Sequence, residues 1–219
     1  MDNASEDQGW FLYDGFRNVY DAGTEWGVSG HDLPHDFVSS LIYELPVGKG
    51  RRFGSGMSGV ADAVLGGWQV SGIFRLASGN PIGLRAPNTL GPFGFPVQRP
   101  VISDYKDLEV GTRTPERWFN IDAVSAPGKF EIGPAPRYLP NIRIDGTTNA
   151  DIALMKNFRI REALRVQFRA EAFNLANTPQ FGMPSTGAQA TVGSGAFGTV
   201  RDTFVNDARS LQFGLKVYF

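Results

Sequence analysis

The clearest structural signal in the sequence is Leu164-Arg165-Val166-Gln167-Phe168-Arg169-Ala170-Glu171-Ala172, in which apolar and polar side chains alternate strictly. A helix would repeat its apolar residues at every third and fourth position, so this period of two indicates a β-strand with one apolar face. Alternation also predicts four more strands, over residues 37–45, 65–76, 149–158 and 211–219, although it is less regular at 37–45 and 149–158. Only residues 62–65 suggest a helical turn. The sequence therefore predicts an all-β protein.

The connections between these strands differ greatly in length. Those at 76–149 and 172–211 are long and rich in proline or glycine, with a short strand expected over 197–201, whereas those at 45–65 and 158–164 are shorter. Outer-membrane barrels alternate short periplasmic turns with long extracellular loops. If the last strand runs from the extracellular side to the periplasm, both long connections are extracellular and both shorter ones are periplasmic. This is the arrangement that such a barrel requires.

The composition argues against several classes of protein, among them nucleic-acid-binding, cysteine-dependent and helical membrane proteins. Lys+Arg is 21 and Asp+Glu is 22, so the net charge of −1 gives no electrostatic reason to bind nucleic acid. The absence of cysteine excludes disulfide scaffolds, cysteine zinc sites and thiolate nucleophiles. No apolar run approaches the roughly 18 residues of a membrane-spanning helix, but strands of about 9–11 residues can cross a bilayer when tilted. From the pattern alone, the apolar face meets either lipid or the second sheet of a soluble sandwich.

Six segments resemble the downstream half of Oar-like TonB-dependent outer-membrane receptors. They are HDLPHDFV (31–38), YELPVGKGRRF (43–53), LGGWQVSG (65–72), WFN (118–120), KNFRI (156–160) and QFRAEAFNL (167–175). The resemblance implies an antiparallel transmembrane β-barrel of about 22 strands. This chain would hold about its last five strands, with long extracellular loops. The implied organisation is an N-terminal loop region (1–34) followed by the C-terminal part of the barrel (35–219).

The resemblance also implies a location and a function. The location is the outer membrane of a Gram-negative bacterium, and the function is TonB-dependent binding and uptake of a small solute. The implied partners are outer-membrane lipid, the rest of the barrel with its plug, the barrel-assembly machinery, and the TonB system through an N-terminal part that this chain lacks. Phe219 ends an alternating strand and is similar to the C-terminal assembly signal of such barrels.

Two other interpretations remain open at this stage. One is a soluble β-rich surface binding module, for example a carbohydrate-binding domain, and the other is a small stand-alone barrel of about eight strands. Under every interpretation we expect no enzymatic activity, no cofactor, no metal and no nucleic-acid partner.

The candidate functional side chains lie on one strand and in the longest connection. Arg165, Gln167, Arg169 and Glu171 are candidates for the lining of the lumen, although neighbours on one strand face can also pair with each other in a hydrated wall. Trp118 and Phe119 are candidates for contact with a solute, with packing inside the loop as the alternative.

Other motifs suggest chemistry only weakly. His31-Asp32-Leu33-Pro34-His35-Asp36 offers imidazole and carboxylate groups, but a closed zinc site requires four ligands, so we interpret it as a polar junction. In Gly48-Lys49-Gly50-Arg51-Arg52 the lysine is followed by glycine and no helix follows, which indicates a solvated turn and not a phosphate loop. No G-x-S-x-G motif is present, and no pattern brings Glu131 and Asp145 together.

Overall fold

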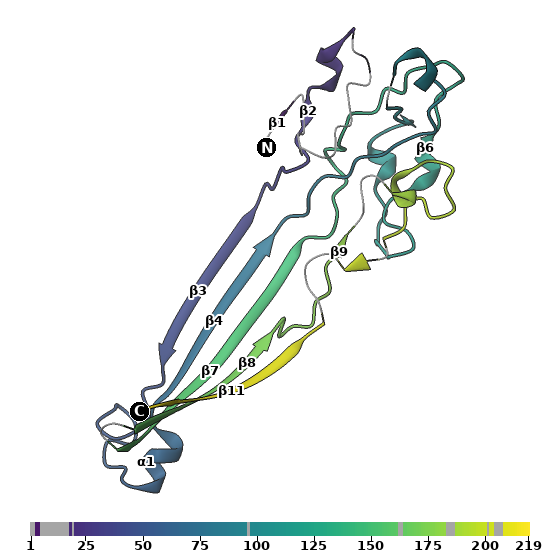
Figure 1. Cartoon of the computed structure of the whole chain (residues 1–219). Coiled ribbons are helices and arrows are strands. Elements are labelled where there is room, and N and C mark those ends of the chain that lie inside the picture. Colours follow the sequence, from purple (N-terminus) through teal and green to yellow (C-terminus); the bar gives the residue numbers. More distant parts are fainter. Residues whose placement is uncertain are drawn as a thin grey trace. The chain divides into compact units, whose positions relative to one another are not determined.

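The computed structural model describes residues 3–4, 18, 20–95, 97–161, 164–182, 187–200, 202–203 and 208–219. Its main feature is a sheet of five long strands that lie side by side (Figure 1). These strands are β3 (Asp36–Glu44), β4 (Trp68–Ala77), β7 (Thr147–Arg161), β8 (Leu164–Phe173) and β11 (Ser210–Tyr218). All five expected strands are confirmed, with ends that differ by only a few residues.

The order of strands in the sheet is β11-β8-β7-β4-β3, so strands that follow each other in the chain are also neighbours in space. β8 pairs antiparallel with both β7 and β11. Gln167 lies opposite Asn157 and Lys216, whereas Phe168 lies opposite Lys156 and Leu215. Because side chains alternate across a strand, this register continues each face of β8 onto its neighbours.

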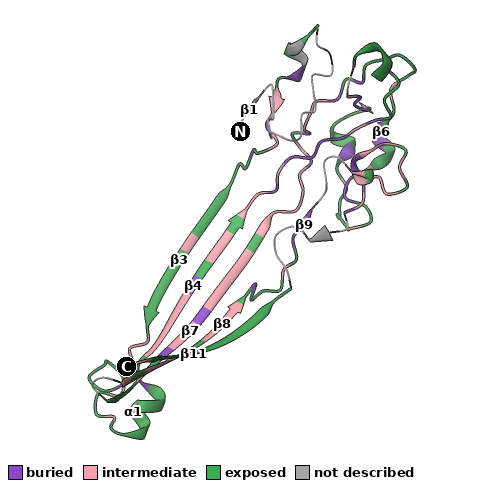
Figure 2. Ribbon diagram, in the orientation of Figure 1, coloured by how far each residue is buried: buried purple, intermediate pink, exposed green. Residues whose placement is uncertain are grey.

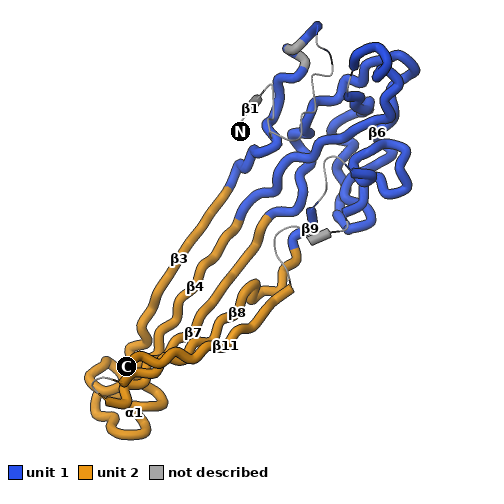
Figure 3. The backbone as a smooth tube through the Cα atoms, in the orientation of Figure 1, with its two compact units in different colours: residues 1–35, 77–146, 180–205 blue, residues 36–76, 147–179, 206–219 orange. Residues whose placement is uncertain are grey.

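The chain divides into two compact units, each of which has most of its residue contacts within itself (Figure 3). Unit 1 comprises residues 1–35, 77–146 and 180–205, and unit 2 comprises residues 36–76, 147–179 and 206–219. The first boundary lies next to the expected one between residues 34 and 35. Beyond it the units interleave along the chain, because the long connections leave the strands and return to them.

Unit 1 is built from short elements around a hydrophobic core. Its two-residue strands are β1 (Asn3–Ala4), β2 (Gly27–Val28), β5 (Val101–Ile102), β6 (Val124–Ser125), β9 (Phe181–Gly182) and β10 (Asp202–Thr203). Its 3-10 turns are η1 (Ala22–Glu25), η2 (Gly91–Phe93), η3 (Lys106–Leu108), η4 (Ile121–Ala123) and η5 (Ala188–Ala190). Ile82, Leu108, Phe119, Leu139 and Ile142 are buried together in its core. The longest connection is therefore a packed structure and not an extended loop.

The expected short strand over residues 197–201 is wrong for its described part. Residues 197–200 form turn and loop, while Arg201 lies outside the described residues. Gly198 adopts a positive φ of 80°, a conformation that suits a turn and not a strand.

Unit 2 contains the sheet and one short helix, α1 (Val60–Leu65), which overlaps the single helical turn expected at 62–65. Among the described residues, no helix is long and apolar enough to cross a membrane.

The side chains of the sheet are much less buried than those of unit 1. Figure 2 shows β3 and β11 almost wholly exposed and the three strands between them mostly intermediate. Ala153 is the only hydrophobic residue of unit 2 among the described buried residues. By contrast, Phe37, Leu211, Phe213 and Leu215 are each at least 60% exposed. The sheet as described therefore presents a large apolar surface that nothing covers within unit 2.

Candidate functional site

The polar face of the sheet begins with the alternating residues of β8. Arg165, Gln167, Arg169 and Glu171 occupy one side of the strand, because each is two residues from the next. Across the ladders this face continues onto Asn157 of β7 and Lys216 of β11. The structure thus places all four predicted lumen residues on one face, together with polar residues of the neighbouring strands.

These side chains pair with each other and with side chains of the two neighbouring strands. Arg169 Nη2 lies 2.7 Å from Glu171 Oε1, and Gln167 Nε2 donates a hydrogen bond to Asn157 Oδ1 at 3.1 Å. The Arg165 guanidinium lies 4.7 Å from the centre of the Tyr218 ring. The contacts correspond to a mutually paired wall, which is the alternative that the sequence left open for these residues.

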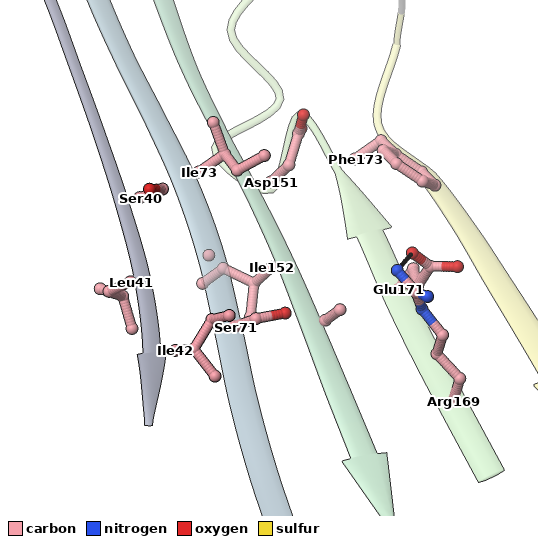
Figure 4. A pocket seen from close by; sticks show the side chains of 12 residues that line it. Ser40, Leu41, Ile42, Ser71, Ile73, Asp151, Ile152, Arg169, Glu171 and Phe173 are labelled. Atoms are coloured by element: carbon pink, nitrogen blue, oxygen red, sulfur yellow. Dashed lines mark ion pairs between the residues drawn. The ribbon is translucent and has the colours of Figure 1, made fainter. Parts of the chain in front are cut away.

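A groove of about 600 Å³ lies on the sheet and includes part of this wall. It is lined by Ser40, Leu41, Ile42, Ser71, Gly72, Ile73, Asp151, Ile152, Ala153, Arg169, Glu171 and Phe173. Figure 4 shows Arg169 and Glu171 turned toward each other at one side of the groove. The groove therefore combines an ion pair and two hydroxyl groups with aliphatic and aromatic surface.

The groove also contains side chains that sequence reasoning did not select. Ile42 and Ile73 are 72% and 54% exposed and interrupt the polar face on β3 and β4. Asp151 Oδ1 accepts a hydrogen bond from the Asn174 backbone N–H at 2.9 Å, so this carboxylate fixes the turn that follows β8. The imperfect alternation of the strand at 37–45, where Ile42 falls among polar positions, was the available signal for an apolar patch here.

A second ion pair joins β3 and β4. Arg75 donates two hydrogen bonds to the Asp36 carboxylate, with N···O distances of 3.1 and 3.0 Å. Two parallel hydrogen bonds give an arginine–carboxylate pair a defined geometry. The pair lies between adjacent strands, so it fixes their register, and the sequence alone did not identify it because the partners are far apart in the chain.

The two solute-contact candidates of the longest connection lie in the core of unit 1. Phe119 is fully buried, and its ring packs edge-on against Phe197 with centroids 5.4 Å apart. Trp118 is 6% exposed, and its indole N–H donates to the Arg143 carbonyl at 2.8 Å. Phe119 is therefore packed inside the loop, whereas Trp118 also lines a pocket of about 340 Å³ in unit 1, and contact of Trp118 with a solute stays a prediction.

The acidic residues of the 31–36 motif are engaged in ion pairs. Asp32 is buried, and its Oδ2 lies 2.5 Å from Arg143 Nη2, while Asp36 pairs with Arg75. Among the described residues, no group of three or more His, Asp or Glu side chains could hold a metal ion.

The remaining motifs have local structural contacts. In the turn at 48–52, the Lys49 backbone N–H donates to Asp62 Oδ1 at 2.6 Å and Arg51 pairs with Glu44 at 2.8 Å. Glu131 Oε2 accepts from the Gly128 N–H, and Asp145 Oδ2 accepts from the Phe181 N–H. The Glu131 contact stabilises a turn, the Asp145 contact joins two distant segments, and neither suggests a reacting pair.

Phe219 follows the last residue of β11 and exposes its whole side chain. Its role as an assembly signal is not tested by this geometry and stays a prediction.

Comparison with known proteins gives one family. A family model described as an outer membrane beta barrel domain matches residues 1–212, a range that contains four of the long strands and the start of β11. No curated protein and no solved structure matches the chain.

Proposed function

Because this chain belongs to the outer membrane beta-barrel domain family, we propose that it forms part of the wall of an Oar-like TonB-dependent receptor and contributes to uptake of a small solute. The family and the strand order make the sheet an antiparallel segment of a transmembrane β-barrel with long extracellular loops. Its location is the outer membrane of a Gram-negative bacterium. The proposed role is structural and ligand-binding, without catalysis.

The observation that supports this role most strongly is the difference between the two faces of the sheet. One face carries Phe168, Phe213 and Leu215 among its exposed or half-buried side chains, with the Phe168 and Phe213 rings stacked at 6.5 Å. The other carries the polar network around Gln167 and the Arg169–Glu171 pair. In a barrel that surrounds a wet lumen, the apolar face meets lipid and the polar face meets water.

In this proposal the wall and the groove have different roles. The paired side chains of β8 keep the lumen surface hydrated and rigid, while the groove offers both apolar and hydrogen-bonding surface to a passing solute. Such mixed surfaces are typical of small-molecule sites, in which a few polar groups orient a ligand against apolar walls. In this proposal, Ser40, Ser71 and the Arg169–Glu171 pair supply the polar contacts, and the isoleucines of the groove supply the apolar ones.

The other interpretation, a soluble β-rich surface binding module, has no observation that supports it. A soluble sandwich would cover the apolar face with a second sheet, but the residues of that face on β11 are exposed. Within the described residues, β3 and β11 are the two edges of the five-stranded sheet. Unpaired backbone groups are costly in lipid, so these edges require further strands of a larger barrel.

The TonB-dependent part of the proposal is tested in two steps. The first step reads the genomic sequence upstream of the Met1 codon, where we expect a signal peptide, a TonB-binding segment and a plug in frame. The second step measures binding of the purified full-length receptor to the periplasmic domain of TonB from the same bacterium. An in-frame stop immediately upstream together with no binding to TonB would leave a membrane barrel without this transport mechanism.

A further inference from the structure

The connection between β3 and β4 contains a short helix whose side chains are almost all apolar. The sequence of α1 is VADAVL, so Asp62 is its only charged residue. Val60, Val64 and Leu65 are 79%, 55% and 51% exposed, and no residue of the helix is buried. A surface helix of a globular protein normally turns its apolar side chains toward a core. The apolar side chains of α1 have no such core within the described part of unit 2.

The single charge of α1 is engaged within the same connection. Asp62 Oδ1 accepts a hydrogen bond from the Lys49 backbone N–H at 2.6 Å, so the carboxylate side of the helix faces the start of the connection. Val60 and Val64 each lie two residues from Asp62. Two residues correspond to a rotation of about 200° around a helix, so both valines lie on the side opposite the carboxylate. The outer side of α1 is therefore apolar.

Two side chains of the sheet hold the end of α1. The Trp68 indole N–H donates to the Val64 carbonyl at 2.9 Å. Lys156 Nζ donates to the Gly66 carbonyl, directly after the helix. Lys156 lies opposite Phe168 in the β7–β8 ladder, on the face assigned to lipid, and its ammonium lies 5.2 Å from the centre of the Trp68 ring. The C-terminal end of α1 is therefore attached to the lipid face of the sheet and not to the lumen face.

The position of α1 along the strands corresponds to the boundary of the membrane. Figure 1 shows the helix at the end of the sheet where β3 ends and β4 begins. The connection between these strands is one of the two shorter ones, which lie on the periplasmic side of an outer-membrane barrel. Tryptophan and lysine side chains at the end of a lipid-facing surface are typical of the interface between bilayer and water. The helix therefore lies at the level of the periplasmic leaflet.

We propose that α1 is an interfacial helix, with Val60 and Val64 inserted among the acyl chains of the periplasmic leaflet of the outer membrane. The partner is lipid, because the helix is attached to the face of the sheet that the barrel fold assigns to lipid. An interfacial helix buries its apolar side chains about 5–10 Å into the boundary between headgroups and acyl chains. The inference rests on the outer-membrane location of the sheet and not on TonB-dependent uptake, so it can fail while the transport proposal stands.

The test measures the depth of single spin labels in the full-length receptor, reconstituted into phosphatidylcholine vesicles. The labels are attached to Val60→Cys or Val64→Cys in a receptor without other cysteines. Power-saturation electron paramagnetic resonance compares collisions of each label with oxygen, which concentrates in the bilayer, and with a water-soluble nickel chelate. We expect oxygen collisions to exceed nickel collisions at both positions. Ser55→Cys, in an exposed turn of the same connection, is the matched control, and nickel collisions are expected to dominate there.

Two results would overturn the proposal. Nickel collisions that exceed oxygen collisions at positions 60 and 64 would place α1 in the water of the periplasm. Protection of both labels from both reagents would show that another part of the receptor, or a periplasmic protein, covers the helix in place of lipid. Both valines are exposed, so the variants are expected to fold, which the folded barrel band on unheated gels verifies. Each position tests the proposal by itself if the other variant folds poorly.

Discussion

The two units of this molecule place their large apolar side chains in opposite ways. In unit 1, Phe119, Leu108 and Ile142 are fully buried in a core assembled from the two long connections. In unit 2, Phe213 and Leu215 are each 69% exposed, and no comparable core exists among the described residues. Large apolar side chains are therefore buried by protein in unit 1, whereas in unit 2 they are exposed to whatever surrounds the sheet.

Each unit is stabilised by different surroundings. Burial of apolar side chains inside the protein stabilises unit 1 in water, as in any soluble domain. Unit 2 has no such core among the described residues, so its exposed apolar side chains are stabilised by contact with lipid. A change in the core of unit 1 should therefore affect the loops, and a change on the apolar face should affect membrane insertion.

The largest expected effect comes from the core of unit 1. Phe119→Ala removes a fully buried ring and is expected to destabilise unit 1 by about 3–5 kcal/mol. Intact cells that carry the full-length receptor should then show faster cleavage of its loops by added protease. The exposed Phe93→Ala is the control, with little change expected. If Phe119→Ala also removes the folded barrel band on unheated gels, then a change in the core of unit 1 affects folding of the sheet as well. That result would contradict the expectation that it affects only the loops.

The next effect tests the apolar face of unit 2. Phe168→Arg in the full-length receptor places a cation in lipid and is expected to cost about 2–4 kcal/mol near the membrane midplane. Gln167→Arg lies one residue away on the polar face and is expected to cost little. The measurement is folding yield in lipid vesicles. Equal yields, or a lower yield for Gln167→Arg, would reverse the assignment of the faces.

A smaller effect tests the close packing of unit 1. A Cβ added to Gly79 would lie 1.9 Å from the Ile144 carbonyl oxygen, so the backbone of Gly79→Ala must shift. Overpacking of this kind costs about 1–3 kcal/mol, and protease digestion of the loops should accelerate accordingly. Gly111→Ala is the matched control, because nothing lies within 4 Å of the added Cβ. Identical digestion rates for the two variants would show that unit 1 is loosely packed at Gly79.

The five strands could be predicted from sequence because each carries its own pattern of alternation. The packing of unit 1 could not, since Trp118 and Phe119 become buried only when distant segments such as the one around Phe197 fold against them. The same limit applies to the Asp36–Arg75 pair, whose partners meet through the sheet. The four polar residues of β8 were placed on one face correctly, but their pairing with Asn157 and Tyr218 depends on a register that no local pattern specifies.

The smallest effect concerns the paired wall. Arg169→Gln removes the ion pair with Glu171, and the arginine side chain is 47% exposed. Pairs this accessible to water contribute about 0.2–1 kcal/mol, so the midpoint of urea unfolding in lipid vesicles should fall only slightly. A drop as large as that of Phe168→Arg would mean that the polar face is buried against another part of the receptor.

The assignment of lipid and water to the two faces is tested most directly by single cysteines at positions 166, 167, 168 and 169. Residues 1–219 contain no cysteine, so only cysteines outside this range of the full-length receptor need replacement. In isolated outer membranes, Gln167→Cys and Arg169→Cys are expected to react with a charged, water-soluble maleimide. Val166→Cys and Phe168→Cys are expected to react only with a probe that partitions into the bilayer. A reversed pattern, or one without alternation along the strand, would contradict the account.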